Sequence, residues 1–148
     1  MIMMASFAVE GLAELTAAFE KGSQVPDEVK NNVLIAMANV AADALKKTGT
    51  DMEIRDEDNQ SGIHILDSIK IKKPKLTDDG GSIIITFTGS RTRGNTKTRN
   101  AEIAFINEFG ANARGIEAKQ WIAHANESCE EEAIKAGQAV LDAWIETL

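Results

Sequence analysis

The chain is poor in the residue types that most often carry covalent chemistry. Among its 148 residues it has one cysteine, two histidines and no tyrosine. The single cysteine, Cys129, cannot form an internal disulfide, which fits a reducing compartment. Cys129 lies in an apolar stripe with helical spacing, and no basic neighbour is evident that would lower its pKa. This pattern favours a buried structural thiol over a reactive one.

Long hydrophobic runs are also missing. No run approaches the roughly 18 apolar residues that a membrane-spanning helix needs. The apolar start at residues 1–5 lacks the basic residues and the cleavage site of a secretion signal. We therefore expect no membrane association, and we expect synthesis and assembly in the cytoplasm.

Basic residues are fewer than acidic ones. The chain has 16 Lys and Arg against 23 Asp and Glu, a formal net charge of −7. Because DNA binding depends on basic side chains that displace counterions from phosphates, this balance argues against a general nucleic-acid binder and leaves only a local contact. With 43% hydrophobic residues the chain can bury one core, which predicts a single domain over residues 1–148.

Hydrophobic periodicity predicts two long helices. The first covers residues 26–47, where Pro26 suits the first helical position and the two acidic residues after it favour the positive end of the helix. The second covers residues 121–147, along which apolar side chains recur at helical spacing. A short third helix before the last loop follows from the capping ability of Asn100 and the stop at Gly110.

Alternating apolar and polar residues predict an antiparallel sheet. The segments 63–73 and 82–89 alternate in this way, and the turn between them is rich in aspartate and glycine. A short strand at Phe7 is a candidate third member. The expected fold is α+β, with the two long helices packed on one face of the sheet.

Two polar segments are predicted to be flexible loops, over residues 48–62 and 88–100. The second carries a basic stretch made of Arg91, Arg93, Lys97 and Arg99. It contains no aromatic residue on which a base could stack, so it lacks half of what single-strand recognition uses. A solvated hairpin extension, a contact with an acidic protein neighbour and a contact with DNA phosphates all stay open.

The stretch from Asn100 to Ala125 organises the predicted fold. Phe105 and Phe109 fall on one face of the short helix, and Trp121 begins the last long helix. We expect these aromatic side chains to pack on the sheet and helix, so that both ends of the intervening loop are fixed.

Charged and apolar residues around this stretch have alternative roles. Glu108 is expected to bind backbone amides of the following loop or Arg114, with a contact between subunits as the alternative. Near the end of the chain, Trp144 is predicted to pack along the first long helix or to meet another subunit, together with Ile145 and Leu148.

Several short motifs in this stretch resemble a known family. The order Glu108-Phe109-Gly110, Ala118, Trp121 and Ala125 is similar to that of the small tail-component family of long-tailed, lambda-like bacteriophages. Upstream, Gly-Leu-Ala-Glu-Leu at residues 11–15 follows the family's order, as does Ser61-Gly62 followed by Leu66, Ser68 and Ile69. The family usually has Pro-Phe where this chain has Gln120-Trp121, and Thr where it has Ala111, which leaves the conformation of the loop open.

The resemblance implies a function. Members of the family are head–tail joining or tail-completion proteins, which are non-enzymatic virion components of the neck. It implies a homo-oligomeric ring, a hexamer being one ring size, that contacts tail and connector proteins and lets DNA pass without specific binding. No cofactor or metal is implied. The candidate interface residues are Glu108, Phe109, Gly110, Arg114, Trp121, Arg91, Arg93, Lys97, Arg99 and Trp144.

Two other classes of function remain as alternatives. His124, Glu127 and Glu131 lie near one face of the last helix, and they could form part of a metal-binding or enzymatic site if another element supplied a further ligand. The basic 91–99 segment could instead make the protein a small DNA-contacting adaptor.

Overall fold

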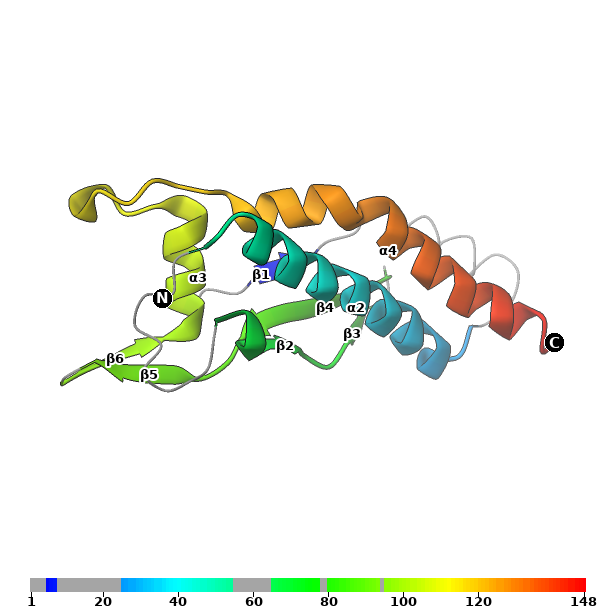
Figure 1. The fold of residues 1–148 in the computed structure, drawn as a ribbon. Coiled ribbons are helices and arrows are strands. Elements are labelled where there is room, and N and C mark those ends of the chain that lie inside the picture. The colour runs from blue at the N-terminus through cyan, green and yellow to red at the C-terminus, as the bar shows by residue number, and fades with distance from the viewer. Residues whose placement is uncertain (1–4, 8–24, 55–64, 78–79, 94) are drawn as a thin grey trace.

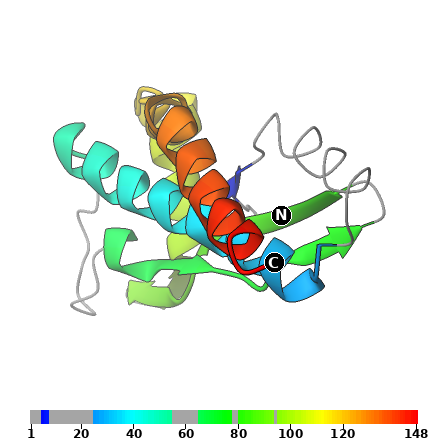
Figure 2. The ribbon, with the colours of Figure 1, turned by 90° about the vertical axis from the view of Figure 1, so that its right-hand side faces the viewer.

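Two helices of 25 residues each, α2 (Asp27–Asp51) and α4 (Trp121–Ile145), lie on the same side of an antiparallel sheet (Figure 1). The view turned by 90° shows the same layering (Figure 2). Helix α2 contacts the sheet directly, and α4 packs along α2. The predicted α+β fold, with two long helices on one face and a short helix before the last loop, is confirmed.

The computed structural model describes residues 5–7, 25–54, 65–77, 80–93 and 95–148. The remaining elements are, in chain order, β1 (Ala5–Phe7), the 3-10 helix η1 (Ile65–Ser68), β2 (Ile69–Ile71), β3 (Lys75–Thr77), β4 (Gly80–Phe87), β5 (Ser90–Arg93), β6 (Thr96–Arg99), α3 (Asn100–Phe109) and the 3-10 helix η2 (Asn112–Arg114). The motifs at residues 11–15 and 61–62 lie outside the described residues. Among the described residues, no helix has both the length and the hydropathy to cross a bilayer.

Strand β4 is the centre of the sheet. Strand β1 pairs with it on one side, which confirms the candidate N-terminal strand, and β2 pairs on the other. Strand β3 also pairs with β4, further along. Between the pairs Ile71↔Ile85 and Lys75↔Ser82, the β2–β3 side contains one residue more than the β4 side. Strands β2 and β3 are therefore one strand that is interrupted by a bulge at Pro74.

Of the strand predicted over residues 63–73, only Ile69–Ile71 form a strand among the described residues 65–73, and the prediction was wrong at residues 65–68. Ile65–Ser68 form a 3-10 turn in which the hydroxyl of Ser68 donates a hydrogen bond to the carbonyl of Ile65 at 2.6 Å. Ile65 and Leu66 are both buried. Adjacent buried residues suit a tight turn that folds under the helices, whereas an alternating strand would bury only one of the two.

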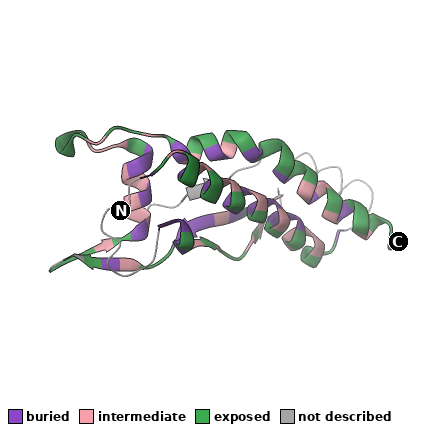
Figure 3. Ribbon diagram, in the orientation of Figure 1, coloured by how far each residue is buried: buried purple, intermediate pink, exposed green. Residues whose placement is uncertain are grey.

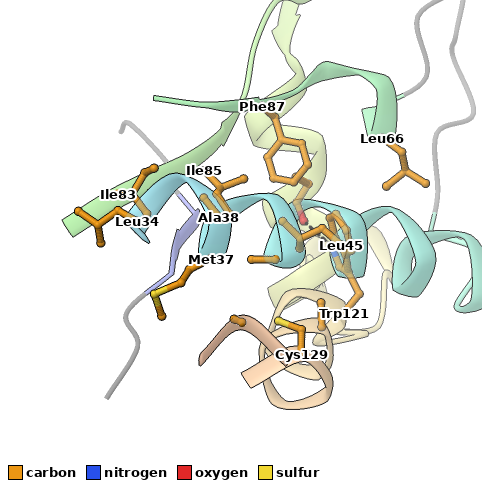
Figure 4. Close-up of a cluster of buried hydrophobic side chains, with 14 of the residues drawn as sticks. Leu34, Met37, Ala38, Leu45, Leu66, Ile83, Ile85, Phe87, Trp121 and Cys129 are labelled. Atoms are coloured by element: carbon orange, nitrogen blue, oxygen red, sulfur yellow. Dashed lines mark hydrogen bonds between the residues drawn. The ribbon is translucent and has the colours of Figure 1, made fainter. Parts of the chain in front are cut away.

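The core lies between α2 and the sheet on one side and between α2 and α4 on the other (Figure 4). Ile83, Ile85 and Phe87 of β4 alternate along the strand and are buried on the side of the helices. Small residues let α4 approach α2 closely: a Cβ atom added at Gly137 would lie 3.0 Å from the Sδ atom of Met37. The sequence of the buried α4 stripe is Trp121, Ala125, Cys129, Ala133, Gly137 and Leu141.

Helix α2 extends beyond its predicted end. Residues 48–51 are helical, so the prediction of a flexible loop over residues 48–62 was wrong there, and Ile54 just beyond is buried. Gly49 is an interior residue of α2 at a close contact. A Cβ atom there would lie 2.6 Å from Leu66 Cδ2 and 3.2 Å from the Trp121 ring. Residues 55–62 lie outside the described residues.

The prediction of a flexible loop over residues 88–100 was wrong at residues 90–93 and 96–99, which form a hairpin, as one of the three alternatives for this segment held. Strands β5 and β6 pair over four residues each and form a separate two-stranded sheet that projects beyond β4 (Figure 1). No apolar alternation marks this segment, because the hairpin is held by a polar contact between Arg91 and Asn100.

Candidate subunit-contact site

The end of α3 and the start of α4 satisfy each other's free backbone groups. The carboxylate of Glu108 accepts hydrogen bonds from the amides of Ile122 at 2.6 Å and Ala123 at 3.3 Å. In return, the amides of Lys119 and Gln120 donate to the carbonyls of Asn107 and Glu108 at 2.8 and 3.0 Å. Helix ends need such partners, and a carboxylate is favoured at a helix N-terminus. These hydrogen bonds hold the end of α3 against the start of α4, and the two helices are connected by an 11-residue crossing, 110–120.

Glu108 therefore has the structural role that the sequence predicted, but with different partners. The amides that it binds belong to α4, not to the loop, and Arg114 lies exposed in η2. The residue before α4, Gln120, makes no side-chain capping bond and has a φ angle of 49°. Glu108 takes the place of the missing cap.

Gly110 is required by two features of this junction. Its φ angle is 76°, and an added Cβ atom would lie 2.7 Å from the amide nitrogen of Ala118 and 2.8 Å from the carbonyl oxygen of Ile116. The predicted helix stop at Gly110 is confirmed, and its close approach to the returning chain is a further reason for glycine. Beyond it, Ala111 and Ile116 form an isolated bridge, and the intervening tip is exposed.

Trp121 is the buried anchor of the junction. Its side chain is fully buried, and its ring centroid lies 5.7 Å from that of Phe87 in β4 (Figure 4). Its indole Nε1 donates a hydrogen bond to the carbonyl of Ala104 in α3 at 3.1 Å. One side chain therefore joins α4 to both the sheet and α3.

Phe105 and Phe109 do not share that environment. Their ring centroids are 4.5 Å apart, and Phe109 is 63% exposed. The prediction that aromatic side chains fix both ends of the crossing was wrong at this end. The helix turns a different face to the core, namely Asn100, Ala104, Asn107 and Glu108. The phenylalanine pair is left on the outer side of α3.

The basic hairpin is held by a buried arginine. Arg91 is 4% exposed, and its Nε and Nη2 atoms donate to Asn100 Oδ1 at 3.2 and 3.1 Å. The amide of the Asn100 side chain donates to the carbonyl of Thr88 at 2.8 Å. Asn100 was predicted to cap α3, but the helix begins at Asn100 itself and Arg99 precedes it.

This arrangement changes the predicted basic surface. Arg91 is part of the hairpin's own structure, and its side chain is buried. Lys97 and Arg99 are exposed, and the side chain of Arg93 lies outside the described part of the structure.

The other candidate residues are spread along α4. His124, Glu127 and Glu131 are exposed, and within the described residues no three side chains of His, Cys, Asp or Glu are placed to hold a metal ion. Trp144 is half-buried and packs against the core, whereas Ile145 is exposed. Trp144 thus follows the packing alternative.

Cys129 is a buried thiol, as the sequence predicted. Burial raises the pKa of this thiol, a backbone hydrogen bond lowers it, and the nearby carboxylates of Glu132 and Glu130 raise it further. A thiol with a raised pKa forms little of the reactive thiolate near neutral pH.

A lysine-lined groove was missed by the sequence analysis. It has a volume of about 620 Å³ and is lined by Lys70, Ile71, Lys72, Lys73, Lys75, Ser82 and Ile84. The signal was present: the stretch 68–77 contains four lysines and no acidic residue in an otherwise acidic chain. What the sequence could not show is that the interrupted strand brings these lysines beside the central strand.

Comparison of the chain with protein-family models, with curated proteins and with solved structures found no match. The resemblance to phage tail components therefore rests on the residues themselves.

Proposed function

We propose that this protein is a non-enzymatic structural component of a bacteriophage virion. In this proposal it joins or completes the tail at the head–tail interface by assembling into a ring. The observation that supports the proposal most is the junction between α3 and α4. The motif residues Glu108, Gly110 and Trp121 all serve to hold one rigid crossing, and that crossing leaves Phe109 and the η2 tip exposed.

The projecting hairpin gives further support. The hairpin β5–β6 and the 110–120 crossing extend from the same end of the molecule, on either side of α3 (Figure 1). A two-stranded hairpin alone is of marginal stability and has open hydrogen-bonding edges. Neighbouring subunits or tail and connector proteins would complete such edges.

The charge of the protein suits a channel through which DNA moves. A net charge of −7 disfavours tight phosphate binding. The burial of Arg91 also reduces the basic surface that the hairpin can offer. DNA passes nearby in this proposal, and contacts between proteins supply the affinity.

One feature of the crossing is particular to this chain. The family's proline at position 120 would need a φ angle near −65° and would lack an amide hydrogen. Here Gln120 has a φ angle of 49° and its amide donates to Glu108. The support for the proposal is therefore the hydrogen-bonded contact between the ends of α3 and α4, and the backbone of the 110–120 crossing differs from that of the family at position 120.

The decisive experiment combines genetics with electron microscopy in the phage or prophage that encodes the protein. Deletion of the gene should give separate heads and tails, or tails of aberrant length, and a plasmid copy should restore virions. Purified protein should bind the ends of isolated tails or connectors. A protein that stays monomeric, binds neither structure and is not needed for virion assembly would refute the proposal.

A further inference from the structure

The lysine groove lies on the sheet face that points away from the helices. Along β4, Ile83, Ile85 and Phe87 are buried under α2, so the alternate residues Ser82 and Ile84 point to the opposite face. Across the strands, Lys70 is paired with Thr86 and Lys75 with Ser82. All four lysines of the groove are exposed, and Ile84 supplies apolar surface between them, whereas Ile71 is paired with Ile85 and its side chain points to the helices.

The opposite side of the molecule has the complementary composition. The buried stripe of α4 faces α2, and a helical period of about 100° per residue places Glu127, Glu131, Ile134 and Asp142 on the outer face, with the exposed Lys135 at its edge. The three carboxylates are exposed, and Ile134 is 37% exposed. In Figure 3 the ribbon of α4 is coloured as exposed along its outer side, away from α2.

We propose that the lysine groove of one copy receives the outer face of α4 from a second copy. The lysines would pair with the carboxylates, and Ile134 would meet the apolar surface of Ile84. Opposite charge across an interface favours encounter and fixes its orientation. The inference rests on the proposed function in that it names the contact by which a ring would form.

The placement of the two faces determines the kind of assembly. The groove is on the sheet layer and its partner is on the outer helix layer, so one molecule uses both faces at once and each contact is head-to-tail. Contacts of this kind close into rings when the rotation between subunits allows it. The alternative of groove against groove would bring eight lysines together, and lysines on a strand edge also oppose edge-to-edge pairing.

The inference is tested by reversing charge on each face separately. The first variant is Lys70→Glu/Lys75→Glu in the groove, and the second is Glu127→Lys/Glu131→Lys on α4. Sedimentation of the full chain at low and high salt should show that the wild type self-associates and that added salt weakens the association. Each variant alone should associate at least tenfold more weakly.

Recombining the two changes separates this contact from a general effect of charge. A single chain that carries all four substitutions should associate again, as should an equimolar mixture of the two variants. The control Lys46→Glu/Lys47→Glu makes the same charge change at exposed residues of α2 and should associate like the wild type. Circular dichroism of every variant checks that it is folded.

Several results would overturn the inference. These are a monomeric wild type, single-face variants that associate normally, or no recovery on recombination. So would a groove variant that loses binding of a duplex DNA oligonucleotide while its self-association is unchanged. Binding to isolated tails and connectors is measured in parallel, so that a protein that docks there through other residues leaves the proposed function standing.

Discussion

The carboxylate of Glu108, the penultimate residue of α3, accepts a 2.6 Å hydrogen bond from the backbone amide of Ile122 in the first turn of α4. The two residues are 14 positions apart, and the bond closes the whole crossing between the helices. The side chain of Glu108 is buried, and its carboxylate is the acceptor for the amides of both Ile122 and Ala123. The junction is thus a single hydrogen-bonded unit.

The first prediction concerns variants that lack this carboxylate. Glu108→Ala should destabilise the fold by about 1–3 kcal/mol, because two part-buried amides then lose their acceptor. Glu108→Gln keeps one acceptor oxygen and should cost less. Urea unfolding measures both. Glu117→Ala, at an exposed position of the same crossing, is the control and should change little. Equal stability of the Glu108→Ala and Glu117→Ala variants would contradict the capping role.

The second prediction compares two glycines of the crossing, both with positive φ angles. Gly115→Ala should cost about 1 kcal/mol for the left-handed conformation alone, because nothing lies within 4 Å of the added Cβ atom. Gly110→Ala should cost at least about 1 kcal/mol more, since its Cβ atom would meet backbone atoms of Ile116 and Ala118 that must then move. Thermal unfolding of the two variants gives the difference. A Gly110→Ala variant as stable as Gly115→Ala would show that the returning chain is not held there.

The sequence was sufficient where periodicity carries the information. The long apolar stripes predicted α2 and α4, and the start of α4 at Trp121 was correct. Strand β4 was predicted nearly to its ends. In these elements, local pattern and tertiary packing favour the same structure.

The sequence was insufficient where a polar or small residue has a tertiary partner. Glycine is common just past a helix end, but Gly49 lies inside α2 and makes room for Leu66 and Trp121. Asn100 resembles a cap, but it binds Arg91. Phe105 and Phe109 have the spacing of a core stripe, yet the core takes Ala104, Asn107 and Glu108. Each of these outcomes depends on a contact with another element, and one helix or strand alone contains no sign of it.

The third prediction tests the buried arginine of the hairpin. Arg91→Gln should destabilise β5–β6 by about 1–3 kcal/mol, because Asn100 loses its charged donor in a buried place. The hydrogen-exchange rates of the hairpin amides should rise by the factor that this loss of stability corresponds to in the opening equilibrium of the hairpin. Arg99→Gln, at an exposed position of the same hairpin, should leave that exchange nearly unchanged. Equal effects of both variants would mean that the Arg91–Asn100 contact does not hold the hairpin.

The fourth prediction concerns the exposed ring of Phe109. Phe109→Ser should change the free energy of unfolding by no more than about 0.5–1 kcal/mol, because most of the side chain is already in water. In the proposed function, the same variant should weaken binding to tails or connectors, which a pull-down with isolated tails measures. The matched variant is Trp121→Phe, which should act on stability because that ring is fully buried. A Phe109→Ser protein that binds and complements normally would remove this residue from the interface.

The fifth prediction concerns Cys129 and alkaline pH. The pKa of the folded thiol is raised above its ordinary value of 9.0, so the folded state holds its proton more tightly than the unfolded state. Around and above that pH the unfolded chain binds fewer protons, and the free energy of unfolding must fall as pH rises. The stabilising contribution is therefore complete below pH 9.0 and is lost above it. Urea unfolding from pH 7 to 10.5 should show this decline in the wild type and a shallower one in Cys129→Ala, in which no thiol ionises. Identical slopes in the two proteins would show that Cys129 is as free to ionise in the folded state as in the unfolded chain.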